Sequence, residues 1–435
     1  MLNLDKKLEK RQEEGKIIQT GIVGAGQMGR GMATQMVLMK GISPSIVSDI
    51  VVEHAVNAFL YAGIDRSDIV VADTLSEANG AMEKGKYVAT SNSDIVSQAN
   101  LVDCVIDATG VPDVGARVAR DAMCNRKHVV MLNVETDVVL GPYLKKLAEK
   151  EGVIYTGSAG DEPGAVMELY SFAKAMGLDV KVIGKGKNNK LDYNCNPDTV
   201  LEEATRRGVS PKMLCAFKDG TKTMVEMTAM SNATGMIPDV IGGHGIASDV
   251  MGLNEKFKLI QDGGILHQHG VVEFVNGIAP GVFVTVSTEN EEIAYQMSYH
   301  SMGPGPLWTL YRPYHLCNLE TPLSVAKAII DGEPTIVPLE GLVSECITVA
   351  KRDLKAGETI DGIGGYTTHG SIACLGDSDK NGCVPYGLVT NKTKMKKDIK
   401  KGKLLTLSDV ELDSSTLIYQ LRKEQDAMYG RSILE

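Results

Sequence analysis

A glycine-rich turn between two apolar segments limits the fold of this chain more than any other feature of its sequence. Residues 17–23 form an apolar run that predicts a strand, residues 24–29 are Gly-Ala-Gly-Gln-Met-Gly, and residues 30–39 predict a helix. In such a unit the first glycine makes the tight turn, the second lets the backbone approach a pyrophosphate, and the third lets helix and strand pack closely. The motif therefore predicts a Rossmann-type domain with dinucleotide contacts from Gly24, Gly26, Gln27, Met28 and Gly29.

An acidic residue follows the next apolar run at the distance that this motif requires. Asp49 ends the segment Ser-Ile-Val-Ser-Asp, about twenty residues after the glycines. A carboxylate at this position accepts hydrogen bonds from the adenosine ribose and repels a 2′-phosphate. The next Arg or Lys in the chain is Arg66, so the sequence predicts NAD in preference to NADP. The alternative interpretation is that Asp49 only caps the following helix.

Strand and helix signals alternate through the first 160 residues, as a doubly wound parallel sheet requires. The apolar run 101–110 ends in Asp-Ala-Thr-Gly, and the run 128–133 ends in Leu-Asn. The carboxyl ends of such strands lie where the nicotinamide half of a dinucleotide binds. We therefore expect further cofactor contacts from Asp107, Thr109, Gly110 and Asn133.

The composition argues against several classes of partner. A formal net charge of −10 disfavours nucleic acid. The charged segment 1–16 lacks the apolar core of a signal peptide, and no apolar run approaches the ~18 residues of a membrane span. Eight cysteines without a Cys-x-x-Cys pair are typical of reduced thiols. We expect a cytoplasmic protein that binds a small-molecule substrate, has no nucleic-acid or membrane partner, and forms a homo-oligomer.

The character of the sequence changes twice along the chain. After about residue 160 the loops lengthen and glycines become frequent, and from about residue 341 short strand and turn signals dominate. These changes predict an α/β protein with a Rossmann domain at 1–160, an α+β catalytic domain at 161–340, and a small β-rich domain with a C-terminal tail at 341–435.

Several motifs resemble those of the homoserine-dehydrogenase-like oxidoreductases. The closer resemblance is to the 1-deoxy-D-xylulose 5-phosphate reductoisomerase-like (DRL) family, whose members append a SAF-type β domain. The motifs occur in one order across nearly the whole chain, at residues 106–110, 132–138, 160–163, 184–189, 222–227 and 312–316. The resemblance implies a Rossmann domain, an α+β catalytic domain and a SAF-like domain. It also implies NAD(P)-dependent oxidoreduction of a small polyol, sugar or sugar phosphate, coupled in some relatives to rearrangement of the carbon skeleton.

Two departures from these relatives narrow the expected activity. Homoserine dehydrogenases carry Thr-Ala-Asn-Lys where this chain continues from Leu132-Asn133 into Val134 and Glu135. The missing lysine argues against homoserine or aspartate semialdehyde as substrate. A biosynthetic reductoisomerase is expected to use NADPH, whereas Asp49 favours NAD.

Two lysines are the candidates for proton transfer, which oxidoreduction of a CH–OH group requires. Lys185 and Lys187 share the segment 184–189, which predicts a glycine-rich turn. Neighbouring cations disfavour each other's charge, and burial lowers a lysine pKa further. We assign Lys187 as general acid/base and place Lys185 beside the substrate or cofactor. The alternative is a surface turn with two solvated lysines.

Three carboxylates complete the expected site. Asp161 and Glu162 precede a proline, where they could bind substrate hydroxyls or a divalent cation, or cap the next helix. Glu226 lies among Met and Thr residues and, if buried, needs a cationic partner such as Lys222 or a lysine of residues 184–189. We assign Asp161 and Glu162 to the substrate and Glu226 to catalysis. No metal is predicted, because the carboxylates show no ligand spacing.

The segment Tyr-Arg-Pro-Tyr-His at 311–315 combines a guanidinium, two phenols and an imidazole. An arginine grips a carboxylate or phosphate with two hydrogen bonds, and histidine can relay protons. We assign Arg312 and His315 to catalysis and Tyr314 to the substrate. The alternative is an aromatic hinge in which Arg312 forms a salt bridge across domains.

Three other histidines lie outside these motifs. His267 and His269 could share one face of a strand, but a structural role is favoured over a metal site because the sequence places no carboxylate or cysteine near them. His244 lies among glycines and could contact substrate.

The sequence thus predicts a NAD(P)-dependent oxidoreductase with its substrate between the first two domains and the nicotinamide near Lys187 and Arg312. Its substrate class is a small polyol, sugar acid or sugar phosphate, with or without isomerisation. The alternatives are a reductoisomerase using NADPH, a homoserine dehydrogenase, and a sensor that binds dinucleotide without turnover.

Overall fold

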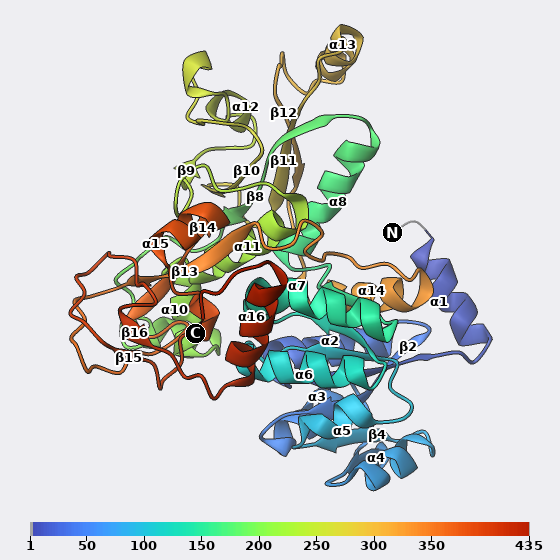
Figure 1. The fold of residues 1–435 in the computed structure, drawn as a ribbon. Helices are drawn as coiled ribbons and strands as arrows, with labels where there is room; N and C mark the ends of the chain where they lie inside the picture. Colours follow the sequence, from blue (N-terminus) through green and yellow to red (C-terminus); the bar gives the residue numbers. More distant parts are fainter. Residues whose placement is uncertain (1–2, 435) are drawn as a thin grey trace. The chain divides into compact units, whose positions relative to one another are not determined.

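The computed structural model describes residues 3–434 and divides into two compact units (Figure 1). Unit 1 comprises Met1–Asp161 and Leu316–Val337, and unit 2 comprises Glu162–His315 and Pro338–Glu435. The charged N-terminal segment forms α1 (Leu4–Glu13), and its first two residues lie outside the described range. None of the helices within residues 3–434 has the length and hydrophobicity needed to cross a membrane.

Unit 1 contains a seven-stranded sheet in which neighbouring strands run parallel. The strand order is β3-β4-β2-β1-β5-β6-β7, so β2, β4 and β3 lie on one side of β1, with β4 between β2 and β3, and β5, β6 and β7 follow one another on the other side. The point between the two halves is where a doubly wound sheet binds its ligand. The strands are β1 (Ile18–Val23), β2 (Ile42–Ser48), β3 (Ile69–Val71), β4 (Tyr87–Thr90), β5 (Cys104–Asp107), β6 (His128–Met131) and β7 (Tyr155–Gly157). The predicted Rossmann-type sheet is confirmed.

Helices connect these strands, and their apolar faces form a core with β1 and β2. Ile18, Ile22, Met32, Met36 and Phe59 are fully buried members of this core. Pro112 starts its helix at the first position, where a missing N–H costs nothing. The helices of unit 1, besides α1, are α2 (Gln27–Leu38), α3 (Val52–Tyr61), η1 (Arg66–Asp68), α4 (Leu75–Met82), α5 (Ser93–Gln98), α6 (Pro112–Cys124), α7 (Val134–Glu151) and α14 (Cys317–Ile330).

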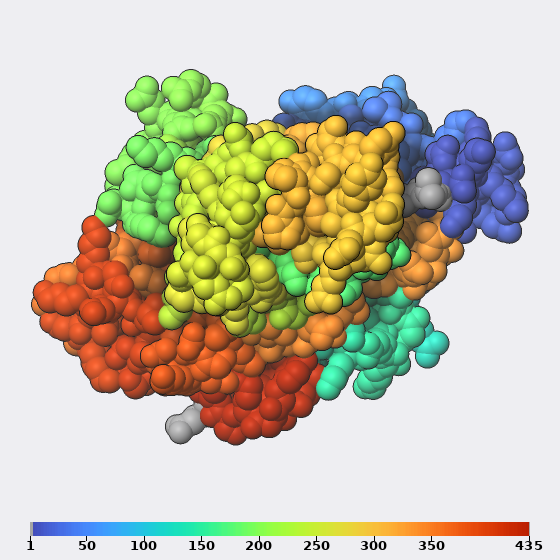
Figure 2. All heavy atoms as spheres, turned by 90° about the horizontal axis from the view of Figure 1, so that it is seen from above, coloured from blue at the N-terminus to red at the C-terminus, as the bar shows by residue number. Residues whose placement is uncertain are grey.

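Unit 2 is built on a five-stranded mixed sheet with the order β12-β11-β8-β10-β9. The central strand β8 runs parallel to β10 and antiparallel to β11. In Figure 2 the segment 241–265 (yellow) lies directly against the segment 285–305 (gold) on one face of this unit. The strands are β8 (Asp179–Lys187), β9 (Ile246–Ala247), β10 (Val271–Asn276), β11 (Val282–Ser287) and β12 (Trp308–Arg312).

Helix α11 (Thr221–Thr234) is the centre of unit 2, because almost all of its residues are buried. It contacts α8 and β8 and also the C-terminal strands β13 and β14. Helices that are buried on all sides show no amphipathic pattern, and this helix accordingly has Met, Thr, Ala and Ser around its whole circumference. The other helices before β13 are α8 (Glu162–Ala175), α9 (Leu201–Arg207), α10 (Pro211–Lys218), α12 (Leu253–Lys256), η2 (Ile260–Asp262) and α13 (Glu291–Tyr299).

The C-terminal segment is rich in short antiparallel strands, as expected. It is tied to α11 by a hydrogen bond between the Ser231 and Ser344 hydroxyls (2.6 Å) and by one from the Gly370 amide to the Thr221 hydroxyl (2.9 Å). Its identity as a SAF-like domain and the three-domain division stay predictions. Its elements are β13 (Ser344–Ala350), β14 (Thr368–Cys374), α15 (Leu375–Asn381), η3 (Tyr386–Leu388), β15 (Lys394–Met395), β16 (Val410–Glu411) and α16 (Leu417–Met428).

Candidate active site

The glycine turn of unit 1 has the geometry that a bound pyrophosphate requires. Gly24 has φ of +99°, and a Cβ there would lie 2.9 Å from the backbone of Ala108. A Cβ on Gly29 would lie 1.8 Å from the Gly24 carbonyl oxygen, so only glycine allows α2 to pack this closely. A Cβ on Gly26 would meet no atom within 4 Å, which leaves open space beside the N-terminus of α2. First-turn amides of a helix have no partner within the helix and attract anions.

Asp49 follows β2 and is hydrogen-bonded to the glycine turn. Its Oδ2 accepts the Ala25 amide at 2.9 Å, while Oδ1 accepts the Val51 amide at 3.0 Å and lies 3.2 Å from Nδ1 of His54. The Val51 contact stabilises the entry to α3, as the alternative interpretation of Asp49 expects. A carboxylate has about four acceptor positions, so these contacts leave capacity for ribose hydroxyls.

Asp107 and Asn133 form an internal network at the ends of β5 and β6. The Asn133 side chain donates to the Asp107 carboxylate at 3.0 Å, and the Thr109 amide donates to the same carboxylate at 3.0 Å. Both side chains are buried, and burial raises the pKa of Asp107 to about 6. In this structure the two residues position the loop that carries Thr109 and Gly110, and their direct contact with a cofactor stays a prediction.

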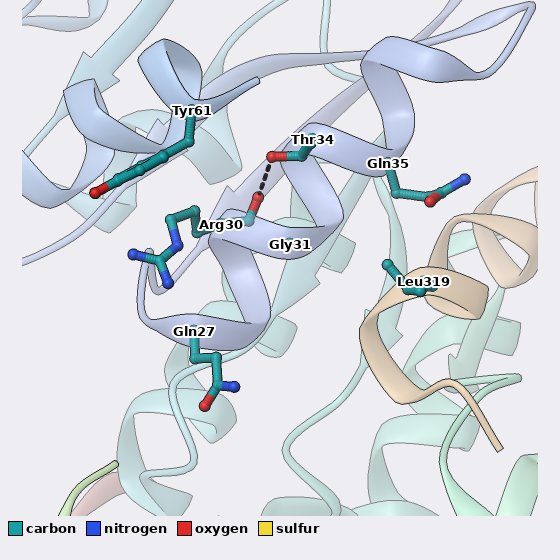
Figure 3. Close-up of a pocket in the computed structure, with 7 residues that line it drawn as sticks. All are labelled: Gln27, Arg30, Gly31, Thr34, Gln35, Tyr61 and Leu319. Carbon is teal, nitrogen blue, oxygen red and sulfur yellow. Dashed lines mark hydrogen bonds between the residues drawn. The ribbon is translucent and has the colours of Figure 1, made fainter. Parts of the chain in front are cut away.

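A surface cavity of about 400 Å³ lies along the outer side of α2 (Figure 3). Gln27 of the glycine motif lines it, together with Arg30, which places its guanidinium 4.7 Å from the centre of the Tyr61 ring. The sequence-based prediction of NAD over NADP considered only the cations that follow Asp49. Arg30 precedes Asp49 in the sequence, but the fold brings its guanidinium to Tyr61 of α3.

The two candidate lysines lie on β8, so the predicted turn at 184–189 is wrong up to Lys187. Residues two apart in a strand share a face, which puts Lys185 and Lys187 on one side and Gly184 and Gly186 on the other. A Cβ on Gly184 would lie 1.9 Å from the Glu273 carbonyl oxygen, and one on Gly186 would lie 2.7 Å from a backbone nitrogen. The glycines therefore serve close packing of the neighbouring backbone, while the lysine face remains available for chemistry.

Lys185 is the centre of a buried ion cluster. Its Nζ donates to Glu162 of α8 at 2.6 Å and also forms an ion pair with Glu226 of α11. This confirms the prediction that a lysine of residues 184–189 partners Glu226. Burial alone would lower the pKa of Lys185, but the two carboxylates outweigh it and raise the pKa. The expectation that both lysines lose charge is therefore wrong for Lys185, which remains a cation.

Lys187 has the opposite electrostatic environment. Its side chain is buried, with the residue 6% exposed, and its Nζ donates to the Phe217 carbonyl at 2.8 Å. Burial, followed by the charge of Lys185, lowers the pKa of Lys187 to about 8. An amine with a pKa in this range can both accept and donate a proton near neutral pH.

The 311–315 segment contributes to the same unit. Nε2 of His315 lies 3.3 Å from Glu162, so this imidazole joins the Lys185 cluster. Arg312 donates to Glu168 of α8 at 3.3 Å, and its guanidinium lies 4.5 Å from the centre of the Tyr314 ring. The salt bridge between Arg312 and Glu168 lies within unit 2, and the catalytic role of Arg312 and the hinge interpretation both stay predictions. Tyr314 is exposed.

Asp161 and Glu162 are adjacent in sequence but belong to different compact units. Asp161 is buried in unit 1, where its carboxylate lies 3.8 Å from the Cys317 thiol. Glu162 is buried at the start of α8. The assignment of both to one substrate stays a prediction.

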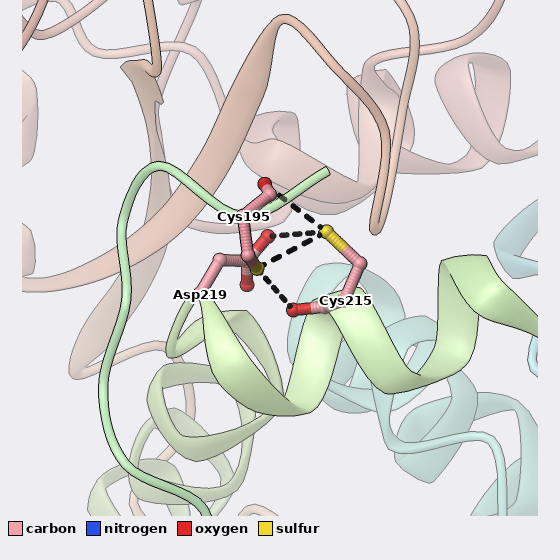
Figure 4. Close-up of side chains that lie close together, drawn as sticks. All are labelled: Cys195, Cys215 and Asp219. Carbon is pink, nitrogen blue, oxygen red and sulfur yellow. Dashed lines mark hydrogen bonds between the residues drawn. The ribbon is translucent and has the colours of Figure 1, made fainter. Parts of the chain in front are cut away.

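A buried cluster beside α10 was not predicted from the sequence (Figure 4). The Sγ atoms of Cys195 and Cys215 are 3.4 Å apart, and Lys351 lies 3.3 Å from Cys215 Sγ and 2.7 Å from Asp219. The hydrogen bond from Cys195, followed by the Lys351 charge, lowers the pKa of Cys215 against the effect of burial. Lys351 and Cys215 are 136 residues apart, so no local pattern reveals their contact.

Lys351 also lines a second cavity, of about 380 Å³, in unit 2. Tyr193, His369 and Lys401 are among the other lining residues, and the Tyr193 and His369 rings are 4.7 Å apart. No feature of the sequence pointed to this cavity, because its lining comes from distant segments of the chain.

Comparison with known families supports an oxidoreductase. Residues 160–321 match the model of the catalytic domain of oxidoreductase DRL. The predicted resemblance to DRL-type oxidoreductases is thereby confirmed for this segment, which contains β8, α11 and the Lys185 cluster.

Comparison with solved structures finds matches of low similarity. A probable dehydrogenase from Thermotoga maritima is 12% identical, covering 74% of this chain and 92% of its own, with a TM-score of 0.44. The scyllo-inositol dehydrogenase from Lactobacillus casei, with bound NAD(H) and scyllo-inositol, is 12% identical over 75% of this chain and 93% of its own, with a TM-score of 0.41. Similarity of this degree says nothing about substrate. Among curated proteins, no sequence matches the chain.

Proposed function

We propose that the protein is a NAD-dependent oxidoreductase that acts on the CH–OH group of a small polyol, sugar acid or sugar phosphate. The observation that carries the proposal is the environment of Lys187. A buried amine with a pKa of about 8 lies on the same strand face as a fixed cation, within the segment that matches an oxidoreductase catalytic domain. The glycine turn and Asp49 support the dinucleotide part of the proposal.

The bound dinucleotide would supply hydride transfer at a carbinol or carbonyl carbon. Lys187 takes the hydroxyl proton during oxidation and returns it during reduction, which is general acid–base catalysis. The Phe217 carbonyl fixes the position of the amine. Lys185, held by Glu162 and Glu226, stays charged and orients polar groups of the substrate. A sugar phosphate or sugar acid would bring its anion to Arg312, in exchange for Glu168.

The proposed function predicts substrate-dependent formation of reduced nicotinamide. Purified protein is incubated with NAD and a panel of polyols, sugar acids and sugar phosphates, and absorbance of the reduced ring is followed. We expect turnover with at least one member, and turnover lowered by at least about 100-fold on the same substrate in the Lys187→Met variant. NAD binding by calorimetry without turnover on any member would instead favour the sensor, and absence of both binding and turnover would contradict the proposal.

Asp49→Asn is expected to shift the cofactor preference. The amide keeps an acceptor for the Ala25 N–H but removes the charge that binds ribose hydroxyls and repels a 2′-phosphate. Hydrogen bonds to charged groups are stronger than those to neutral groups, so the ratio of kcat/KM for NAD to that for NADP should fall about tenfold. Asp73→Asn, at an exposed carboxylate of the same unit, is the matched control. An unchanged ratio would contradict the role of Asp49.

A further inference from the structure

Three side chains with metal-binding atoms converge in unit 2, and none of them belongs to the Lys185 cluster. Nε2 of His244 lies 2.7 Å from Oδ2 of Asp239, and Nδ1 of His267 lies 3.0 Å from the same oxygen. One ligand atom from each residue lies within 4.8 Å of the others. The sequence interpretation paired His267 with His269 and found no carboxylate nearby. The fold instead brings His244 and Asp239 to His267, which lies in a loop and not in a strand.

The three side chains differ in the fraction that is exposed to solvent. The side chain of Asp239 is 1% exposed, that of His244 20%, and that of His267 63%. The Asp239 carboxylate is therefore the most buried of the three ligands, and the His267 imidazole faces solvent. An ion bound by all three would keep coordination positions open to water, which three-ligand sites in proteins typically do.

The backbone around His244 is held in place by a second carboxylate. Glu273 of β10 is buried and accepts the His244 amide at 2.7 Å and the Gly245 amide at 3.2 Å. A Cβ on Gly243 would lie 2.7 Å from this carboxylate, so glycine is needed for the loop to approach it. The Asn276 side chain donates to the Gly245 carbonyl at 2.8 Å. These hydrogen bonds hold the backbone that carries His244 in place.

His267 is also fixed relative to Asp239. Its amide donates to the two carboxylate oxygens at 3.1 and 3.3 Å, in addition to the contact of its ring. Burial alone would raise the pKa of Asp239, but hydrogen bonds from His244 and from the His267 amide and ring outweigh it and lower the pKa. The Oδ2 atom of Asp239 is therefore held between the two imidazole rings.

We propose that Asp239, His244 and His267 bind a divalent transition-metal cation of the Zn²⁺ type. Two imidazole nitrogens and one carboxylate oxygen form a donor set suited to such ions rather than to Mg²⁺ or Ca²⁺, which prefer oxygen ligands throughout. Ligand atoms around a tetrahedral zinc ion lie about 3.3 Å apart, since each is about 2.0 Å from the metal. The observed separations of 2.7 and 3.0 Å open by a few tenths of an ångström when the metal replaces the shared hydrogens.

The proposal is tested with the full-length protein after removal of metal by a chelator and dialysis. Zn²⁺ is titrated by calorimetry, Co²⁺ by visible absorption, and metal content is measured by mass spectrometry. We expect one tightly bound ion per chain at this site, with a Co²⁺ spectrum of nitrogen and oxygen ligation. Binding should also raise the midpoint of thermal unfolding, because the ion binds only the folded loops.

His267→Ala is the decisive variant, because the exposed ring can be removed without disturbing the core. It should lose the bound ion or weaken its affinity at least about tenfold, and it should lose the metal-dependent rise in unfolding midpoint. His244→Ala should do the same. His300→Ala, at an exposed imidazole outside the cluster, should match the parent protein, and circular dichroism verifies the fold of each variant.

Two results would overturn the proposal. The first is failure of the metal-free parent protein to take up Zn²⁺ or Co²⁺. The second is uptake that is equal in the parent and in His267→Ala. A Co²⁺ spectrum with a thiolate charge-transfer band, lost in Cys215→Ser and kept in His267→Ala, would assign the bound ion to the Cys195, Cys215 and Asp219 group instead.

Discussion

Replacing Lys187 by Met is expected to lower kcat by about 10²- to 10⁴-fold, the usual contribution of a general acid–base group. Met keeps the length and apolar stem of the side chain but cannot exchange a proton. The binding of NAD, which depends on unit 1, should be unchanged in calorimetry. Steady-state absorbance assays provide kcat, and Lys190→Met, at an exposed lysine three residues later, is the matched control. A kcat within about threefold of the parent would be incompatible with the assigned role.

The pH dependence of the parent enzyme gives an independent measure of the same group. Below about pH 8 Lys187 is protonated and above it neutral, because burial and Lys185 lower its pKa to about 8. Oxidation needs the neutral amine, so its rate should rise through pH 8, whereas carbonyl reduction should fall. The lowered pKa means that the folded state binds this proton less well than the unfolded state, so the group destabilises the fold increasingly as the pH falls from about 10.5 to about 8, and the full cost is present below about pH 8. Lys187→Met should therefore be at least as stable as the parent at pH 7.

Lys185→Met should reduce the free energy of unfolding by about 3–5 kcal/mol, the usual cost of removing one partner from a buried ion cluster. Glu162 and Glu226 would then share a buried site without their cation. Chemical denaturation followed by circular dichroism measures this loss. Its matched control is Lys181→Met on the same strand, since the Lys181 pair with the exposed Asp179 is worth at most about 1 kcal/mol.

A compensated variant separates charge imbalance from loss of packing. Adding Glu162→Gln and Glu226→Gln to Lys185→Met removes the two carboxylate charges that have lost their lysine partner. Most of the lost free energy of unfolding should therefore return. If the single variant loses less than about 1 kcal/mol, or if the compensated variant is no better, then the ion cluster does not stabilise unit 2 as the contacts indicate.

The sequence was sufficient to predict the Rossmann-type unit, because the sequence features that specify this unit are local. Gly24, Gly26 and Gly29 act within one strand–turn–helix unit, and Pro112 marks a helix start by its own ring geometry. The need of Glu226 for a cation followed from a general rule for buried carboxylates. That rule left Lys222 and the lysines of residues 184–189 as alternatives, and the structure shows the pair with Lys185. Each inference depended on a residue type and its immediate neighbours.

The remaining features depend on contacts between distant segments. Lys185-Gly186-Lys187 has the composition of a turn, and only the approach of the Glu273 backbone shows why those glycines belong in a strand. Asp239 lies 28 residues before His267, so the sequence could not supply the missing carboxylate. Opposite pKa shifts for two lysines on one strand face likewise require knowing which carboxylates the fold brings to each.

The position of α11 bears on how this protein can be divided for experiments. One side of the helix carries Glu226 to the lysine strand, and the other side packs against β13 and β14, which come more than a hundred residues later. A fragment cut at residues 160 and 321 would leave that second side bare and would sever α14 within its first turns. The catalytic segment and the C-terminal strands belong to one compact unit, so fragments for experiments are better divided at the boundaries of the two units, after Asp161, before Leu316 and after Val337.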